Sequence, residues 1–504
     1  MKKLILIVID GFGLRREKKY NAIAEAKKPN YDSLWKNCPH TSLCASGECV
    51  GLPKGSQGNS EVGHLHMGAG RIVRQPLDRI NNSIADKSFF RNKTLAKAAE
   101  KAKKAKHIHL IGLCSDGGIH SHVNHLRAIM EFMHSKKLGG KMVLHFVADG
   151  RDVGIKTAEK YAEQINGWCK KYGGRVAGIC GRFYAMDRDN NWNRTQKFYY
   201  LITEGEGKNF PTTQKAIHYA YSKGARSDYY LPAMSIGEKC FIEDNDVVID
   251  FNFRTDRMRQ IVRALHLKKF SGFKRKKQPK AFLATMTKYD KKVDCPILFR
   301  DVVPGNNLGE NISKKGMKQL RIAETDKYPH VTYFFNSQVE KPFKGEDRIM
   351  VPSEKVDSYD KTPEMSAEGI TQNAVKQIAK NKYGFMLINF ANADLVGHSS
   401  NHKAIVRAVE KVDECLGRVA KAAKKNNYTL IITSDHGNAE ETKYPDGKPK
   451  ASHTTNPVPL ILVSNEKSLS KAKLRKGQLI DVAPTILKIM GIAKPREMTG
   501  KPLF

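Results

Sequence analysis

Runs of apolar residues recur along the chain, and several end in a polar cluster. The first, KLILIVIDGFG, is rich in β-branched residues and leads into Asp10 and a glycine-rich turn. The same pattern returns in YGFMLINFANAD, which reaches Asp394, and in YTLIITSDHGN, which reaches Asp435 and His436. Continuous apolar runs of this length are typical of strands buried on both faces of a parallel sheet. We therefore predict parallel strands whose carboxyl ends carry acids and a histidine.

Between the last two of these strands, HKAIVRAVEKVDECLGRVAKAAKK has helical periodicity, and strand–helix–strand alternation predicts an α/β fold. Four central segments also resemble strands with polar ends, but these ends carry arginines and few acids: HIHLIGLCSDGGIHSH, MVLHFVADGRD, RVAGICGRFYAMDRD and DVVIDFNFRTDR. Open α/β sheets place their sites at the carboxyl ends of the strands, so each of these ends is a candidate site.

The length of 504 residues predicts two or three domains. Proline and glycine interrupt the pattern near residues 73–79 and 301–309, which are the expected seams. The acids and histidines lie toward both ends of the chain, whereas the arginine-tipped strands lie between. If the two ends form one site, the middle is an inserted domain. We expect one discontinuous α/β domain and one continuous insertion.

The formal net charge is +36. Basic residues are spread over short segments such as AKAAEKAKKAKH and FKRKKQPK, which favours solvated faces and loops. Steering of an anionic substrate and binding of nucleic acid are the alternatives. No zinc-finger or RNA-recognition pattern accompanies the charge, so nucleic acid is the less favoured partner.

Neither a membrane span nor a secretion signal is evident in the sequence. The run LILIVI is far shorter than the ~20 residues that a bilayer requires, and no signal-peptide pattern follows. We expect a soluble, cytoplasmic protein with no membrane partner. The nine cysteines are scattered without a CxxC pair, which predicts free, mostly buried thiols in a reducing compartment.

Six acids and imidazoles form a candidate metal site: Asp10, Asp394, His398, Asp435, His436 and His453. In DLVGH, Asp394 and His398 are four residues apart, so one turn can present both to an ion. Mixed carboxylate and imidazole ligands suit Mn²⁺, Zn²⁺ or Fe²⁺ and permit Mg²⁺. This number of ligands suits two ions, which together can stabilise the attacking and departing oxygens of a phosphoryl transfer.

The glycine-rich segment GSQGNSEVGHLHMGAGR contains Ser60. It lacks the lysine of a Walker phosphate loop and the spacing of a GxSxG nucleophile elbow. Two interpretations remain: a glycine-rich turn, or a loop that presents Ser60 as a nucleophile activated by a metal ion.

Eleven ordered motifs, among them GNSEVGHLHMGAGRIV, DGRDV, FNFRTDR, DLVGHS, SDHGNAEE and HTTNPVP, resemble those of the 2,3-bisphosphoglycerate-independent phosphoglycerate mutases. That family belongs to the alkaline phosphatase-like metalloenzyme superfamily, and the resemblance covers essentially the whole chain. It implies interconversion of 3- and 2-phosphoglycerate in glycolysis and gluconeogenesis, without 2,3-bisphosphoglycerate. It also implies a monomer with two divalent ions, foremost Mn²⁺, with Mg²⁺, Zn²⁺ or Co²⁺ as alternatives. The implied domains are a phosphatase-like metal-binding domain (1–74 and 304–504) and an inserted transferase-like, substrate-binding domain (75–303).

Carried over residue by residue, the resemblance implies one ion held by Asp394, His398 and His453, and another held by Asp10, Ser60, Asp435 and His436. Ser60 would form the phosphoserine intermediate, Lys327 would neutralise developing charge, and Asp152 would move the hydroxyl protons. The implied substrate-binding residues are His120, Arg151, Asp152, Arg182, Arg188, Arg254, Arg257 and Lys327. His66 stands where the family usually has asparagine; it either adds a hydrogen bond or has no role, and we do not expect it to be a ligand.

Two other functions are compatible with the same residues. One is a metal-dependent phosphatase or a mutase of the same superfamily that acts on another phosphorylated metabolite. The other is a basic nucleic-acid-binding protein on a decayed enzyme scaffold, which the retention of all seven candidate metal ligands disfavours.

Overall fold

A computed structural model describes residues 2–300 and 303–504. The chain divides into two compact units: unit 1 comprises the residues up to Gln75 together with Val303–Phe504, and unit 2 begins at Pro76 and comprises the intervening residues. The seam expected at residues 301–309 starts with two residues that lie outside the described ones. Within the described ranges, no helix has the length and apolar character needed to span a bilayer.

Unit 1 contains an eight-stranded sheet in the order β11-β10-β12-β1-β13-β14-β2-β15. Its central strand β1 pairs in parallel with β12 on one side and β13 on the other. The bounds are β1 Lys3–Ile9, β2 His40–Cys44, β10 Gln319–Glu324, β11 Glu346–Val351, β12 Phe385–Phe390, β13 Tyr428–Thr433, β14 Val458–Val463 and β15 Gly477–Gln478.

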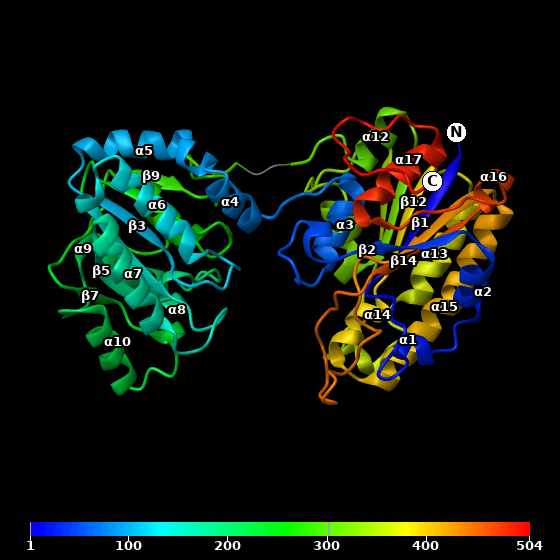
Figure 1. Cartoon of the computed structure of the whole chain (residues 1–504), viewed down its shortest axis with the longest axis horizontal. Coiled ribbons are helices and arrows are strands. Elements are labelled where there is room, and N and C mark those ends of the chain that lie inside the picture. The colour runs from blue at the N-terminus through cyan, green and yellow to red at the C-terminus, as the bar shows by residue number, and fades with distance from the viewer. Residues whose placement is uncertain (1, 301–302) are drawn as a thin grey trace. The chain divides into compact units, whose positions relative to one another are not determined.

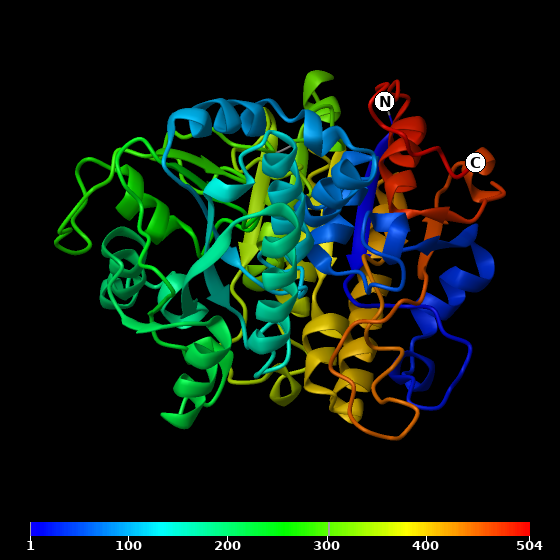
Figure 2. The same cartoon turned by 60° about the vertical axis from the view of Figure 1, so that its left-hand side comes forward.

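Helices cover both faces of this sheet (Figure 1, Figure 2). They are α1 Ala22–Glu25, α2 Pro29–Asn37, α3 Ser60–Ala69, α12 Leu308–Lys314, α13 Ala367–Ala379, α14 Asn392–Leu395, α15 His402–Lys425, α16 Lys467–Ser470 and α17 Val482–Met490. Successive side chains of a strand point to opposite faces, so β1 contributes to two cores. Ile5 and Ile7 pack in the core that contains α13 and α15, while Leu4 and Leu6 pack in the core that contains α3 and α17.

Unit 2 contains a second, seven-stranded sheet in the order β6-β7-β5-β4-β3-β8-β9. The strands are β3 Ile108–Leu113, β4 Met142–Ala148, β5 Arg175–Gly181, β6 Lys208–Phe210, β7 Met234–Ile236, β8 Val247–Asp250 and β9 Phe282–Thr285. The helices are α4 Pro76–Ala85, α5 Lys93–Lys104, α6 Val123–Ser135, α7 Ala158–Tyr172, α8 Arg182–Ala185, α9 Trp192–Glu204, α10 Thr213–Ser222 and α11 Arg259–His266.

The α/β prediction is confirmed, and the strands expected before Asp10, Asp394 and Asp435 form as β1, β12 and β13. The sheets are not parallel throughout, however. β14 runs antiparallel to both β13 and β2, and β7 runs antiparallel to β5. These strands lie toward the sides of the sheets, so the sheet centres keep the expected parallel pairing.

The expectation that all cysteines are free thiols is wrong for one pair. Cys44, at the end of β2, and Cys49 form a disulfide with their Cα atoms 6.0 Å apart. Gly47, with φ of +53°, reverses the chain between them. This turn brings the two cysteines together although they do not form a CxxC motif. The other seven cysteines are free, and four of them are buried.

Candidate functional site

Three buried aspartates meet at the carboxyl ends of adjacent strands in unit 1. Asp10 follows β1, Asp394 lies on α14 just after β12, and Asp435 follows β13 by two residues. Because β12, β1 and β13 are parallel neighbours, their ends deliver the three carboxylates to one edge of the sheet. At most 2% of any of these residues is exposed. Segments from both ends of the sequence therefore build a single acidic cluster.

Two glycines permit this close approach. Gly11 has φ of +76°, and a Cβ added to it would lie 2.7 Å from Cα of Asp394. A Cβ on Gly63, on α3, would lie equally close to Cβ of Asp435. Real Cβ atoms do not approach so closely, so glycine is needed at both positions. The glycine-rich segment can therefore pack directly against Asp435 because it has glycine at position 63.

Ser60 is the first residue of α3, and the side chain of Asn59 caps the helix by accepting a hydrogen bond from the Val62 amide at 2.9 Å. Its hydroxyl Oγ lies 3.0 Å from Oδ1 of Asp10 and 3.0 Å from Nε2 of His436. A helix N-terminus favours negative charge, so this position suits an anionic oxygen or a phosphoryl group.

Lys327, which ends a short 3-10 turn (Thr325–Lys327), places its ammonium among these groups. Nζ lies 2.7 Å from each of three oxygens: Oδ1 of Asp10, Oγ of Ser60 and Oδ2 of Asp394. Burial lowers the pKa of Lys327, but the charges of Asp10 and Asp394 outweigh it and raise the pKa above its ordinary value. The ammonium therefore stays charged and offsets part of the acidic charge.

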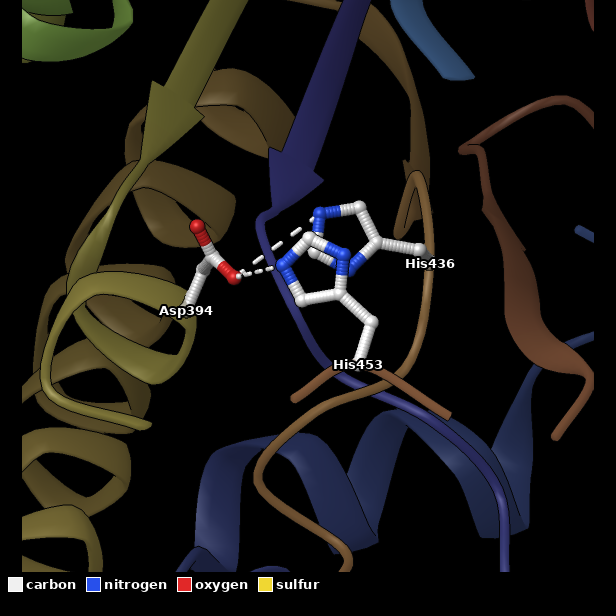
Figure 3. A group of neighbouring side chains, drawn as sticks. All are labelled: Asp394, His436 and His453. Carbon is white, nitrogen blue, oxygen red and sulfur yellow. Dashed lines mark ion pairs between the residues drawn. The ribbon is translucent and has the colours of Figure 1, made fainter. Parts of the chain in front are cut away.

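Three histidines complete this cluster. Figure 3 shows the rings of His436 and His453 facing Asp394, whose Oδ1 lies 3.8 Å and 3.1 Å from their respective Nε2 atoms. The two rings stack with centroids 3.9 Å apart. His398, in the turn after α14, places Nε2 3.4 Å from the same oxygen. Burial lowers the pKa of His436, but the charges of Asp435 and Asp394 outweigh it and raise the pKa to about 10. The cluster of aspartates therefore favours positive charge at this position.

The donor set fits divalent ions. Three buried carboxylates face one ammonium, and Oδ2 of Asp435 is buried without a hydrogen-bond partner among the described residues. Ligand atoms of Asp394, His436 and His453 lie within 4.8 Å of one another, as do those of Asp10, Asp435 and a third residue, His64. His436 lies between the two groups, since its Nε2 is also 3.5 Å from Oδ1 of Asp10.

The structure thus brings together all seven candidate metal ligands and Lys327.

His66 is hydrogen-bonded through both of its ring nitrogens to backbone groups. Its Nδ1 donates to the Val62 carbonyl at 2.6 Å, and its Nε2 accepts from the Val73 amide at 2.9 Å. Burial lowers the pKa of His66 to about 4. Of the two roles considered for His66, the structure supports the hydrogen-bonding one.

The remaining candidates lie in unit 2, where Arg182 is almost fully buried at the start of α8. Its Nη1 lies 2.6 Å from Oδ1 of Asp149 and 2.6 Å from Oδ2 of Asp152. His120 is buried beside this pair, with Nε2 4.0 Å from Oδ2 of Asp152. Burial, followed by the charge of Arg182, lowers the pKa of His120 to about 3, so the ring is neutral.

Asp256 contacts two of the other arginines. Its carboxylate accepts a hydrogen bond from Nη1 of Arg188 at 2.9 Å and lies 3.3 Å from Nε of Arg254. The guanidinium of Arg151 lies 5.9 Å from the centroid of the Tyr229 ring.

Several buried polar atoms of these unit 2 residues have no hydrogen-bond partner among the described residues: His120 Nδ1, Asp256 Oδ1, Arg182 Nε and Arg257 Nε. Buried polar groups in native proteins are normally hydrogen-bonded. The unit 2 cluster is therefore suited to bind a polar, anionic ligand.

Sequence reasoning missed three residues of these clusters. Asp149 and Asp256 lie inside the arginine-bearing segments, and the need of a buried arginine for a counter-charge was the available signal. His64 lies one helical turn after Ser60, and its spacing of four placed it on the same face of α3. Its location among buried residues made it resemble an ordinary core histidine.

Comparison with known proteins extends these observations over the whole chain. Residues 2–494 match the family model of the metalloenzyme superfamily. The chain is 45% identical over 510 residues to a 2,3-bisphosphoglycerate-independent phosphoglycerate mutase of Clostridium botulinum, covering 100% of this chain and 99% of the relative. It is also 45% identical to the Moorella thermoacetica protein of that name, covering 100% and 98%.

A solved structure has the same fold. The phosphoglycerate mutase of Leishmania mexicana, crystallised at low cobalt concentration, aligns with a TM-score of 0.69 and 28% identity, covering 100% of this chain and 98% of that one. The relatives found by sequence and the structure found by fold are thus both phosphoglycerate mutases. The chain belongs to the 2,3-bisphosphoglycerate-independent phosphoglycerate mutase family of the metalloenzyme superfamily.

Proposed function

We propose that the protein interconverts 3-phosphoglycerate and 2-phosphoglycerate through a phosphoserine on Ser60, without 2,3-bisphosphoglycerate. The observation that carries the proposal is the position of Ser60. Its hydroxyl lies at a helix N-terminus within 3.0 Å of Asp10, His436 and Lys327. The name shared by full-length relatives at 45% identity supports the same reaction. We further propose that the protein is a cytoplasmic monomer; a reaction on small metabolites gives the basic surface no necessary role in binding nucleic acid.

Unit 1 is the proposed phosphatase-like, metal-binding part of the enzyme. Asp394, His398 and His453 would hold one ion, and Asp10, Ser60, Asp435 and His436 the other. Carboxylate and imidazole donors suit Mn²⁺, which we propose as the main ion, with Mg²⁺, Zn²⁺ and Co²⁺ as possible substitutes. When bound, such ions supply Lewis-acid stabilisation of charge on the phosphoryl and hydroxyl oxygens.

Unit 2 is the proposed substrate-binding part. Phosphoglycerate carries a phosphate and a carboxylate, and arginine binds both through paired N–H groups. Arg188 and Arg254, with side chains 46% and 52% exposed, can reach a ligand while Asp256 holds them in place. The unpartnered Nε atoms of Arg182 and Arg257 and the unpartnered Nδ1 of His120 support the same assignment. Arg151 is the remaining guanidinium of the proposed set.

We propose the following chemical steps, in which residues of both units would act on the substrate. Ser60 Oγ donates its hydrogen toward Asp10 and attacks phosphorus; the Oγ–P bond forms as the bond from phosphorus to the substrate's 3-oxygen breaks. Lys327 donates to Oγ and neutralises developing charge. The carboxylate of Asp152 would take the proton from the 2-hydroxyl and deliver it to the departed 3-oxygen. The 2-oxygen attacks phosphorus as the Oγ–P bond breaks, and Asp10 returns the hydrogen to Oγ of Ser60. Retention of glycerate by the arginines prevents transfer to water.

A coupled assay tests this proposal. Purified protein with Mn²⁺ and 3-phosphoglycerate, but no 2,3-bisphosphoglycerate, should form 2-phosphoglycerate, and acid quenching should trap phosphate on Ser60. Inorganic phosphate should appear much more slowly than 2-phosphoglycerate. The proposal is wrong if no turnover occurs with Mn²⁺, Mg²⁺, Zn²⁺ or Co²⁺. Faster release of phosphate than isomerisation would instead indicate a phosphatase of the same superfamily.

A further inference from the structure

His64 is a buried residue that the proposed reaction does not use, although it lies within the acidic cluster of unit 1. The residue is fully buried on α3. Its Nδ1 lies 2.9 Å from the carbonyl oxygen of Ser60 and 3.2 Å from Oδ2 of Asp435. Its Nε2 lies 3.1 Å from Nδ2 of Asn389, a fully buried residue of β12. Both ring nitrogens are therefore engaged by protein groups.

The partners fix which nitrogen carries the hydrogen. A carbonyl and a carboxylate only accept hydrogen bonds, so Nδ1 must be the donor. Asn389 Nδ2 also donates to Oδ2 of Asp10 at 2.8 Å, which identifies it as the amide nitrogen and leaves Nε2 of His64 as an acceptor. The result is one continuous chain of hydrogen bonds from Asp10 through Asn389 and His64 to the Ser60 carbonyl. Nδ1 of His64 also lies 3.2 Å from Oδ2 of Asp435, a close contact that is not a hydrogen bond.

This arrangement leaves neither nitrogen of His64 free to bind an ion, although the residue lies close enough to the acids to be considered a ligand. Outer hydrogen-bonding partners of metal ligands orient them and typically account for 10–100-fold in metal affinity. The chain contacts the carboxylate of Asp10, which lies 3.0 Å from the Ser60 hydroxyl, and reaches to 3.2 Å from the carboxylate of Asp435. It also contacts the first turn of the helix that carries Ser60.

We propose that His64 and Asn389 act as one positioning pair, which sets the separation of the Asp10 and Asp435 carboxylates and the direction of Ser60 without binding the ion themselves. The part of this proposal that concerns Ser60 rests on the proposed function, whereas the part that concerns the acids does not. Loss of the pair should weaken ion binding and also lower kcat more than it raises KM. Both effects should be shared by the two residues.

The test measures binding of Mn²⁺ alone to metal-free protein by equilibrium dialysis. We expect His64→Leu to weaken binding 10–100-fold. The matched control is His66→Leu, because His66 is equally buried on the same helix and makes two hydrogen bonds, to Val62 and Val73 rather than to acids. This control should bind Mn²⁺ within twofold of the wild type. Equal binding by the two leucine variants would overturn the proposal.

Two further variants separate positioning from direct ligation. Asn389→Leu should weaken Mn²⁺ binding as much as His64→Leu, and the double variant should lose little more, because both changes break one chain. His64→Asn keeps an N–H at the distance of Nδ1 and should recover most of the affinity, also if the leucine variants fold poorly. Full additivity, or a His64→Asn variant as weak as His64→Leu, would refute the pair. Because Mn²⁺ binding is read without turnover, these results stand apart from the mutase assay.

Discussion

Asp250, at the end of β8 in unit 2, is a buried acid that predicts an unusual pH dependence of stability. Its Oδ1 accepts hydrogen bonds from the Asn252 amide at 3.1 Å and from the Tyr289 hydroxyl at 2.9 Å. Burial nevertheless raises the pKa of Asp250 from 3.8 to about 7. The perturbation is Asp250→Asn, which keeps an oxygen to accept both hydrogen bonds but cannot ionise.

The sign and size follow from proton linkage. Between the ordinary pKa of 3.8 and the folded value of about 7, the folded state binds more protons than the unfolded state. The contribution of Asp250 to stability is therefore fully present below pH 4 and is lost as the pH rises through 7. Each pKa unit corresponds to about 1.4 kcal/mol, so the total is about 4 kcal/mol, of which about 2–3 kcal/mol is lost between pH 5 and pH 8.

Urea unfolding followed by tryptophan fluorescence measures this effect. The chain has three tryptophans, and a Trp35→Phe background leaves Trp168 and Trp192, both in unit 2, as reporters. The stability of Asp250→Asn relative to its parent should improve by about 2–3 kcal/mol on going from pH 5 to pH 8. The control Asp189→Asn changes an aspartate whose side chain is 72% exposed and should show no such trend. A difference between Asp250→Asn and its parent that is constant with pH would refute the reasoning.

Three further changes have defined outcomes. Ser60→Ala should lower mutase turnover by at least about 10³-fold while circular dichroism and urea unfolding remain near wild type, and near-normal turnover would exclude the phosphoserine. Lys327→Met removes the ammonium that faces Asp10 and Asp394, so it should destabilise metal-free unit 1 by about 3–5 kcal/mol in denaturation followed through Trp35. Saturating Mn²⁺ should reduce that loss, and an equal loss with and without Mn²⁺ would contradict the assigned charge balance. Cys44→Ser should cost unit 1 about 2 kcal/mol under oxidising conditions, as should reduction of the wild type, and the variant should be insensitive to reductant.

Local patterns were sufficient to predict the strand ends of the site. Asp10, Asp394 and Asp435 each follow a continuous apolar run, and burial on both faces of a parallel sheet accounts for such runs. The direction of the strands toward the sides of the sheets was not predictable from local patterns. The antiparallel direction of β14 depends on which strand it lies beside, and its apolar run resembles that of a parallel strand.

The least predictable features depend on contacts between distant segments. Asn389 lies inside a buried strand, and its contacts with Asp10 and His64 arise only when β12 and β1 pair and α3 packs over them. Lys327 is the opposite case. A single lysine in a lysine-rich chain is typical of a solvated surface, and only the three buried aspartates account for its burial.

The pairing of β1 also has a consequence for how the protein is made. Lys3 pairs with Tyr428, so the core of unit 1 cannot close until more than 400 further residues have been synthesised. Translation proceeds at about 5–20 residues per second, so between about 20 and 90 s pass between the synthesis of the apolar strand Lys3–Ile9 and that of its partner β13. Unit 2 is continuous in sequence and can fold during that interval. Within unit 1, β1 is synthesised long before its partner β13 and is buried only after β13 has formed, which makes this strand a natural client for chaperones.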